Sequence, residues 1–208
     1  MRSDVLIVAC RDRQPRIECG GGIAGRRTEV DTVHLVSAAA TPLGGDAINI
    51  RVVVEAGARL RVRTAAATVT LPGSLTPESH AFWTLEVAGD LDVDPQPTVV
   101  AATSRHFTST RLELTGSGRV RLRERIQIGR SYERQGFWSG SLNADVDGSP
   151  LLRHRIELGN GSVADDELGA PLASISELHY PDSDVQTAGV RMALAGGGCL
   201  TSWQGQRL

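Results

Sequence analysis

The sequence of 208 residues contains no lysine, and all 22 of its basic residues are arginine. A lysine amine forms the Schiff base of many covalent enzymes, and a lysine contacts the nucleotide phosphates in a P-loop. The SxxK type of serine nucleophile also requires a lysine. The absence of this residue type therefore excludes all three kinds of site.

Cysteine is also scarce, because the chain holds only Cys10, Cys19 and Cys199 and none of them forms a CxxC pair. An odd number of cysteines without that spacing favours a reducing compartment over a disulfide framework. The apolar run near the N-terminus is too short for a signal peptide or a membrane span, and Asp4 precedes it. We therefore expect a cytoplasmic protein that does not bind a membrane.

Aromatic residues make up only 4% of the chain, whereas the hydrophobic fraction is 40%. We expect a core of valine, leucine, isoleucine and alanine on broad sheet faces. The formal net charge of -2 gives no global field that would attract nucleic acid, so nucleic acid is not an expected partner. The length suits one well-buried domain, which we expect to cover residues 1–208.

Alternation of side-chain type is the main structural signal. Apolar side chains recur at every second position over residues 48–54, and again at Leu60 and Val62 after Gly57. A period of two residues predicts half-buried strands, and the glycine turn between them predicts a hairpin. Similar units recur at intervals of roughly 30 residues, around Gly89, around Gly116 and Gly118, and around Gly148.

One hairpin of this kind cannot bury both of its faces, so the repeated units are expected to stack on each other. The predicted fold class is mainly β, with stacked antiparallel hairpins in a β-helix-like or elongated β-sandwich arrangement and little helix.

The sequence lacks the residue spacing of an enzyme or a resident metal site. Its five histidines show no HxH, HxxxH or HExxH pattern, and no GxSxG elbow occurs. The acidic run at residues 165–167 follows a glycine-rich segment, and we interpret it as a solvated loop rather than as catalytic carboxylates. We expect neither catalysis nor a stably bound cofactor.

Two stripes of arginine occupy alternate positions on predicted strands. An acidic partner surface is one explanation for them. The other explanation, which the pattern favours, is that arginine lines the solvated face of each strand and blunts aggregation at sheet edges. The stripes comprise Arg59, Arg61 and Arg63 in the first strand, and Arg119, Arg121, Arg123 and Arg125 in the second.

The most specific segment of the chain spans residues 41–68. It combines the run from Pro42 to Asp46, the alternating strand that follows, Gly57-Ala58 and the run from Thr64 to Thr68. Together with other matching positions, this segment resembles the urease accessory protein UreD (also called UreH) family. The other positions are His34, Leu35, Val36, Pro95, Gln96, Pro97, Glu124, Gly129, Arg130, Phe137 and Gly140.

The resemblance covers roughly residues 30–160, and it describes residues 1–208 as one UreD-like β domain with a shortened N-terminal region and a truncated C-terminal end. It implies a non-enzymatic scaffold with a β-helix-like core. Such a protein binds a UreF-like accessory protein, through it a UreG-like GTPase, and the apo-urease subunits, and it supports nickel insertion into urease. Transient nickel contacts would then use carboxylate, carbonyl or water ligands.

Nine positions follow from the resemblance as candidate motif or interface residues: Gly44, Gly45, Asp46, Pro95, Pro97, Glu124, Gly129, Arg130 and Phe137. Asp46 either caps the entry turn or offers a polar group on a partner surface or nickel path. The alternative function is a stand-alone β-helical ligand-binding module or carbohydrate-active enzyme, which requires a cleft with converging carboxylates and aromatic platforms. The low aromatic content argues against carbohydrate stacking.

Overall fold

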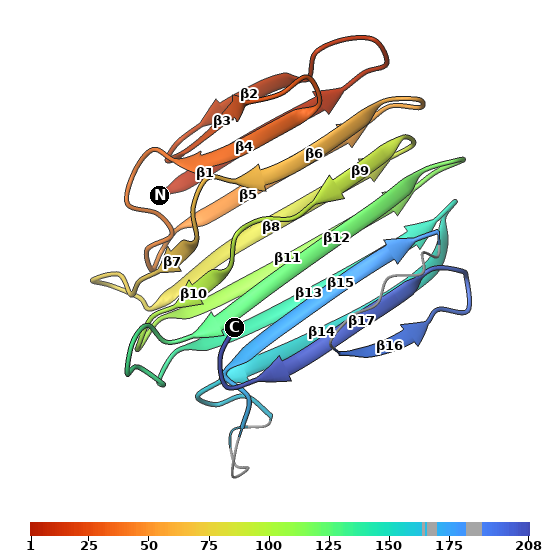
Figure 1. The fold of residues 1–208 in the computed structure, drawn as a ribbon. Helices are drawn as coiled ribbons and strands as arrows, with labels where there is room; N and C mark the ends of the chain where they lie inside the picture. The colour runs from red at the N-terminus through yellow and green to blue at the C-terminus, as the bar shows by residue number, and fades with distance from the viewer. Residues whose placement is uncertain (164, 166–169, 182–188) are drawn as a thin grey trace.

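The computed structural model describes residues 1–163, 165, 170–181 and 189–208. Strands and loops make up this described part of the chain, which contains no helix. The strands form two sheets that lie face to face, and they are stacked along the length of the molecule (Figure 1). The mainly β fold class and the β-helix-like arrangement are thereby confirmed.

The first sheet has seven strands in the order β14-β13-β11-β8-β5-β1-β2. Their bounds are Ser149–Gly159 for β14, Phe137–Val146 for β13, Arg105–Leu114 for β11, Glu78–Val87 for β8, Ala47–Val54 for β5, Arg2–Ala9 for β1 and Arg16–Gly20 for β2. We call it the seven-stranded sheet.

The second sheet has ten strands, eight of them in the order β16-β17-β15-β12-β9-β6-β4-β3, with β10 pairing with both β12 and β7. The eight are Val190–Ala193, Cys199–Gly205, Ala173–Tyr180, Arg119–Ile128, Asp90–Val93, Arg59–Thr64, Thr32–Ser37 and Ile23–Arg27, while β7 is Thr68–Thr70 and β10 is Thr98–Val100. We call it the ten-stranded sheet.

The predicted antiparallel pairing is wrong for most of the repeated units. Strand β5 pairs in parallel with β8, and β6 pairs in parallel with β9, so the two strands that flank Gly57 lie in different sheets. The alternation of apolar residues is the same for a hairpin and for a turn between two facing sheets, because each strand has one apolar face in both cases. Only the turn at Gly148 forms the predicted hairpin, in which β13 and β14 are antiparallel.

Stacking of these turns explains the recurring glycines. A Cβ atom on Gly89 would lie 2.3 Å from the carbonyl oxygen of Ala58, and one on Gly118 would lie 2.3 Å from that of Val87. Each turn therefore packs directly against the backbone of the preceding one, and a side chain at either glycine would prevent this approach.

The core lies between the sheets and is largely aliphatic, as the composition predicted. Ile7, Val52, Leu60, Leu85 and Leu112 are all completely buried. A smaller apolar cluster lies near the C-terminal ends of β10 and β12 and consists of Val100, Ile126, Ile128, Trp138, Ile156 and Leu158. Between these two clusters the inward-facing side chains become small or polar, and this change creates the cavity described next.

Candidate functional site

A cavity of about 300 Å³ lies between the two sheets. It reaches the surface where two strands of the ten-stranded sheet are interrupted, because the exposed residues Ala65–Ala67 and Gln96 contribute to its lining. Residues 65–67 separate β6 from β7, and residues 94–97 separate β9 from β10. We call this opening the mouth. The alanine run and the Pro-x-Pro segment that the sequence singled out are therefore neighbours at one opening.

The two prolines of that segment differ in position. Pro95 lines the cavity, and its carbonyl oxygen accepts a hydrogen bond from Arg125 Nη2 at 2.6 Å. Pro97 is not among the lining residues, and its carbonyl oxygen accepts a hydrogen bond from the Thr68 amide at 3.0 Å. The segment therefore ties the two sides of the mouth together.

Glu124 lies on the inward face of β12 and lines the cavity. Its Oε1 atom accepts a hydrogen bond from Thr108 Oγ1 at 3.0 Å. Burial raises the pKa of Glu124 to about 7, and the bond from Thr108 offsets only part of this effect. The side chain keeps some accessible surface, which faces the cavity. The cavity thus contains a carboxyl group that is partly protonated near neutral pH.

The space around Glu124 depends on Gly140. A Cβ atom at this position would lie 2.1 Å from the indole ring of Trp138 and 3.0 Å from Thr108 Oγ1. The Trp138 ring therefore lies across Gly140 on the inner face of β13. Ala81 occupies the neighbouring strand β8 in the same row of residues, because Ala81 pairs with Thr108 and Thr108 pairs with Gly140. Small residues in this row leave the volume that Glu124 faces.

Two histidines also line the cavity. His106 is buried, its Nδ1 atom lies 2.9 Å from Ser79 Oγ, and burial lowers its pKa to about 4. Burial also lowers the pKa of His154. Both imidazoles are therefore neutral at pH 7, which is the form that can bind a metal. In the part of the chain that the structure describes, however, no three or more His, Cys, Asp and Glu side chains are grouped so that they could hold a metal ion.

Gly44, Gly45 and Asp46 do not line the cavity, and the two glycines pack against the loop of residues 71–77. A Cβ atom on Gly44 would lie 1.8 Å from the carbonyl oxygen of Thr76, and Gly45 has a φ of 91°. The Gly44 amide donates to the carbonyl oxygen of Leu71 at 2.9 Å, and the Gly45 amide donates to that of Glu78 at 2.7 Å. The two glycines therefore hold the backbone of this loop through close contacts and hydrogen bonds at its ends.

The Asp46 carboxylate is buried and fully engaged. It accepts hydrogen bonds from the Leu43 amide and from Thr41 Oγ1, each at 2.8 Å, and lies 2.5 Å from the N-terminal ammonium. Burial opposes its ionisation, but the bonds from Leu43, the ammonium and Thr41 outweigh this effect, so the pKa of Asp46 is lowered. These contacts favour the turn-capping interpretation of Asp46.

Gly129, Arg130 and Phe137 belong to another loop, residues 129–136, and to the strand that follows it. A Cβ atom on Gly129 would lie 1.9 Å from the carbonyl oxygen of Glu133. Arg130 Nη2 lies 2.5 Å from the Glu133 carboxylate. Phe137 is buried, and the guanidinium of Arg105 lies 4.1 Å from the centre of its ring. Of the nine candidate residues, Pro95 and Glu124 therefore line the cavity, Pro97 lies in the segment at its mouth, and the other six lie in or next to these two loops.

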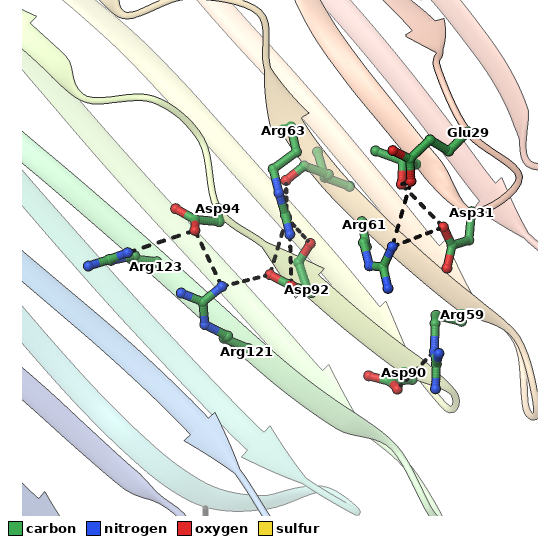
Figure 2. A network of polar contacts seen from close by, with 12 residues as sticks. Glu29, Asp31, Arg59, Arg61, Arg63, Asp90, Asp92, Asp94, Arg121 and Arg123 are labelled. Atoms are coloured by element: carbon green, nitrogen blue, oxygen red, sulfur yellow. Dashed lines mark hydrogen bonds and ion pairs between the residues drawn. The ribbon is translucent and has the colours of Figure 1, made fainter. Parts of the chain in front are cut away.

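The arginine stripes lie on the outer face of the ten-stranded sheet, where acidic residues of neighbouring strands pair with them (Figure 2). Asp92 lies 2.8 Å from Arg63 Nη2 and 3.3 Å from Arg121 Nη1. An exposed pair such as Arg59 with Asp90 contributes only about 0–1 kcal/mol, but the pairs balance the charge of the stripes. The pairing favours the solvated-face interpretation. The paired arginines are Arg59, Arg61, Arg63, Arg121, Arg123 and Arg125.

Comparison with known proteins identifies the chain. The model of the UreD urease accessory protein family matches residues 24–179. The chain belongs to the UreD family. This result confirms the resemblance that the sequence segments indicated.

Several curated UreD proteins are similar to the chain. Urease accessory protein UreD 1 of Saccharopolyspora erythraea is 40% identical over 145 residues, covering 69% of this chain and 57% of the relative. UreD of Frankia alni is 36% identical over 237 aligned residues, covering 97% of this chain and 80% of the relative. UreD of Frankia casuarinae is 41% identical over 140 residues, covering 62% and 44%. The matched regions therefore range from under half to four fifths of these relatives.

Several residues of this UreD chain escaped the sequence reasoning. Thr108, Trp138 and His154 line the cavity, yet no motif distinguishes them.

Of the acidic run at 165–167, only Asp165 is described: its Oδ2 accepts a hydrogen bond from the Gly161 amide at 2.8 Å, while Asp166 and Glu167 lie outside the described residues. A search of the described ranges for a helix with the length and hydropathy to cross a membrane finds none.

Proposed function

We propose that the chain is a scaffold of urease maturation that binds apo-urease together with a UreF-like accessory protein, and through the latter a UreG-like GTPase. In this proposal it acts as a chaperone in the cytoplasm and supports delivery of nickel to the urease active site. Membership of the UreD urease accessory protein family supports this role.

The cavity supports a part for this chain in handling the nickel ion. It opens at the surface, its lining is largely apolar, and it presents the carboxyl group of Glu124. A carboxylate with neighbouring hydroxyl groups and water suits weak, reversible binding of a divalent cation, whereas a closed set of His and Cys ligands would retain it. Nickel is thus a transient cargo in this proposal, with Glu124 as its first protein ligand.

The alternative of a stand-alone ligand-binding module or carbohydrate-active enzyme has less support. A glycosidase uses two carboxyl groups that face the same bond. The cavity lining includes two glutamates, Glu124 and Glu177, but the Glu177 carboxylate pairs with Arg121 Nε at 2.8 Å on the outer face of the sheet. Glu124 is therefore the single acidic side chain among the described residues that faces the cavity.

Deletion of the gene and complementation test the proposal. Cells without the protein should contain nickel-poor, inactive urease, and the full chain should restore the nickel content measured by mass spectrometry of purified urease. The chain should also co-purify with apo-urease and the UreF-like protein. Normal urease nickel in the deletion strain would overturn the proposed function.

Glu124→Gln separates nickel handling from assembly. Glutamine has almost the same size and can still accept the bond from Thr108, but it binds a cation weakly because it carries no charge. We expect this variant to co-purify with its partners at wild-type levels and to restore less urease nickel. Glu18→Gln, in an exposed pair with Arg16 at 2.7 Å, is the matched control and should restore nickel fully.

A further inference from the structure

Two loop tips that the cavity does not use carry fully exposed apolar side chains. Tyr132 has a relative exposure of 106%, and Leu75 has one of 97%. Tyr132 also has a φ of 67°, in the left-handed region that non-glycine residues seldom adopt. This backbone conformation costs free energy, and the Tyr132 side chain gains no packing within the chain to offset it.

The loop that carries Tyr132 is rigidly built. The Glu133 carboxylate lies beneath the tip, where it accepts hydrogen bonds from the Ala102 amide at 3.0 Å and from the Arg130 amide at 3.1 Å. The Arg130 guanidinium, followed by these two amides, lowers the pKa of Glu133 to about 2. The Gly129 amide donates to the carbonyl oxygen of Val100 at 2.7 Å. These bonds hold the backbone of the loop on both sides of Tyr132.

The loop that carries Leu75 is equally well supported. Gly44 and Gly73 approach each other so closely that a Cβ atom on Gly73 would lie 2.2 Å from the carbonyl oxygen of Gly44. The Gly73 amide donates to the carbonyl oxygen of Thr76 at 3.0 Å and closes the loop around Leu75. Two of the glycines that the sequence singled out, Gly44 and Gly129, thus support the loops with these exposed tips.

Both loops lie on the same side of the stack, where β8 and β13 begin (Figure 1). Residues 71–77 lead into β8, residues 129–136 lead into β13, and β11 lies between these two strands in the seven-stranded sheet. Adjacent strands are about 4.8 Å apart, so the bases of the loops are about 10 Å apart. The turns around Gly57, Gly89 and Gly116 lie on the opposite side.

We propose that these two loops, which we call the loop ridge (residues 71–77 and 129–136), dock a partner protein whose surface offers apolar pockets for Tyr132 and Leu75. The charge of the loop at residues 129–136 indicates which polar groups should surround the pockets of the partner. The charge of Arg130 is balanced by Glu133, whose carboxylate also accepts hydrogen bonds from two backbone amides, whereas Arg134 is exposed two residues from Tyr132. Arg134 therefore gives this loop a net positive charge, which fits pockets that are rimmed by carboxylates.

A second copy of the chain does not fit this description. A two-fold contact would place two ridges of the same positive charge against each other, and like charges at an interface oppose association. The ridge is also convex, because its apolar side chains protrude from the loop tips, whereas they require a concave acceptor. A different protein is therefore the partner, and the choice of candidates rests on the proposed function.

The test measures dissociation constants of the purified full chain for the UreF-like protein and for apo-urease separately. Tyr132→Gly should weaken binding to one of them at least tenfold while leaving the melting temperature unchanged or higher, because glycine relieves the left-handed strain. Leu75→Ser should weaken the same interaction. Arg134→Glu should weaken it more at low salt than at high salt. Val30→Ala removes another exposed apolar side chain outside the ridge and should bind as wild type does.

The outcomes distinguish the two proposals. If the wild-type chain binds a partner and Tyr132→Gly binds equally well, the docking role of the ridge is refuted and the proposed function stands. If the wild-type chain binds neither protein, both proposals fail. If Tyr132→Gly instead abolishes self-association of the wild-type chain, a second copy is the occupant and the assignment of a different partner is overturned.

Discussion

Replacing Glu124 by glutamine should change how the stability of the protein depends on pH. The ordinary pKa of the carboxyl group is 4.5, and burial raises it to about 7 in the folded chain. Between these two values the folded state binds more protons at this site than the unfolded state does. The contribution of Glu124 to stability is therefore fully present below pH 4.5 and falls as the pH rises towards 7.

The size of the effect follows from the two pKa values. A change from 4.5 to about 7 corresponds to roughly 3 kcal/mol of unfolding free energy. The carboxyl group is partly accessible, and solvent screening lowers this figure, so we expect about 1–3 kcal/mol. Glutamine is neutral at every pH and lacks this slope. The variant and the wild type should thus be similar at pH 5, and the variant should be more stable at pH 8.

Thermal and urea unfolding of both proteins at a series of pH values measure this difference. For a chain of this size, 1 kcal/mol corresponds to a shift of about 2–4 °C in melting temperature. Glu18→Gln, which alters an exposed carboxylate, should follow the wild-type curve within about 0.5 kcal/mol at every pH. Parallel curves for wild type and Glu124→Gln from pH 5 to pH 8 would refute the placement of a buried carboxyl group in the cavity.

Three further substitutions test the site. Gly140→Ala should lower the unfolding free energy by about 2–4 kcal/mol in urea titrations, because its Cβ atom would clash with the Trp138 ring; an unchanged midpoint would contradict that contact. Asp46→Asn should lower the melting temperature if the carboxylate caps the turn, whereas unchanged stability with less active urease would favour a functional carboxylate. Glu133 contributes stability above pH 4.5 that is lost as the pH falls towards 2. In Glu133→Gln, the melting temperature followed by circular dichroism should therefore fall less between pH 4.5 and pH 2 than it does in the wild type.

The sequence predicted the strands well because their pattern depends on burial alone. Apolar residues at every second position of residues 48–54 identify the inward face of β5, and the structure buries Ile48, Ile50, Val52 and Val54. The pairing of the strands could not be obtained in this way. A glycine turn such as that at Gly57 joins strands of one sheet or of two facing sheets with the same alternation, and long-range stacking decides between them.

Glu124 could have been recognised as an inward residue from the sequence. In the strand from Arg119 to Ile128, it shares its parity with Val120, Leu122 and Ile126, while the arginines have the other parity. A lone glutamate in an apolar row is a buried polar group that requires an explanation. The cavity beside it was not predictable, because it depends on Gly140 and Ala81, which become its neighbours only through strand pairing.

The exposed side chains at the loop tips could not be predicted from the sequence pattern, for a different reason. Nothing in the local sequence distinguishes Tyr132 from a packed tyrosine, and its exposure follows from bonds that Glu133 makes to Ala102, 31 residues away. The sequence did indicate the supporting residues, because Gly129 and Gly44 permit close backbone contacts that other residues would prevent. The glycines of the motif therefore indicated the positions of the supported loops, but they did not indicate which side chains are exposed at the loop tips.

The loop ridge and the mouth of the cavity are linked by one short strand. Strand β7 contains only residues Thr68–Thr70, with Ala67 of the mouth before it and Leu71 of the ridge after it. Three residues of extended chain span about 10 Å, so a protein docked on the ridge lies beside the opening. Leu43 pairs with Leu71, and Gly44 bonds to the Leu71 carbonyl oxygen. A defect at Gly44 would therefore displace Leu71, the first residue of the ridge loop, and with it the end of β7, the strand that leads from the mouth.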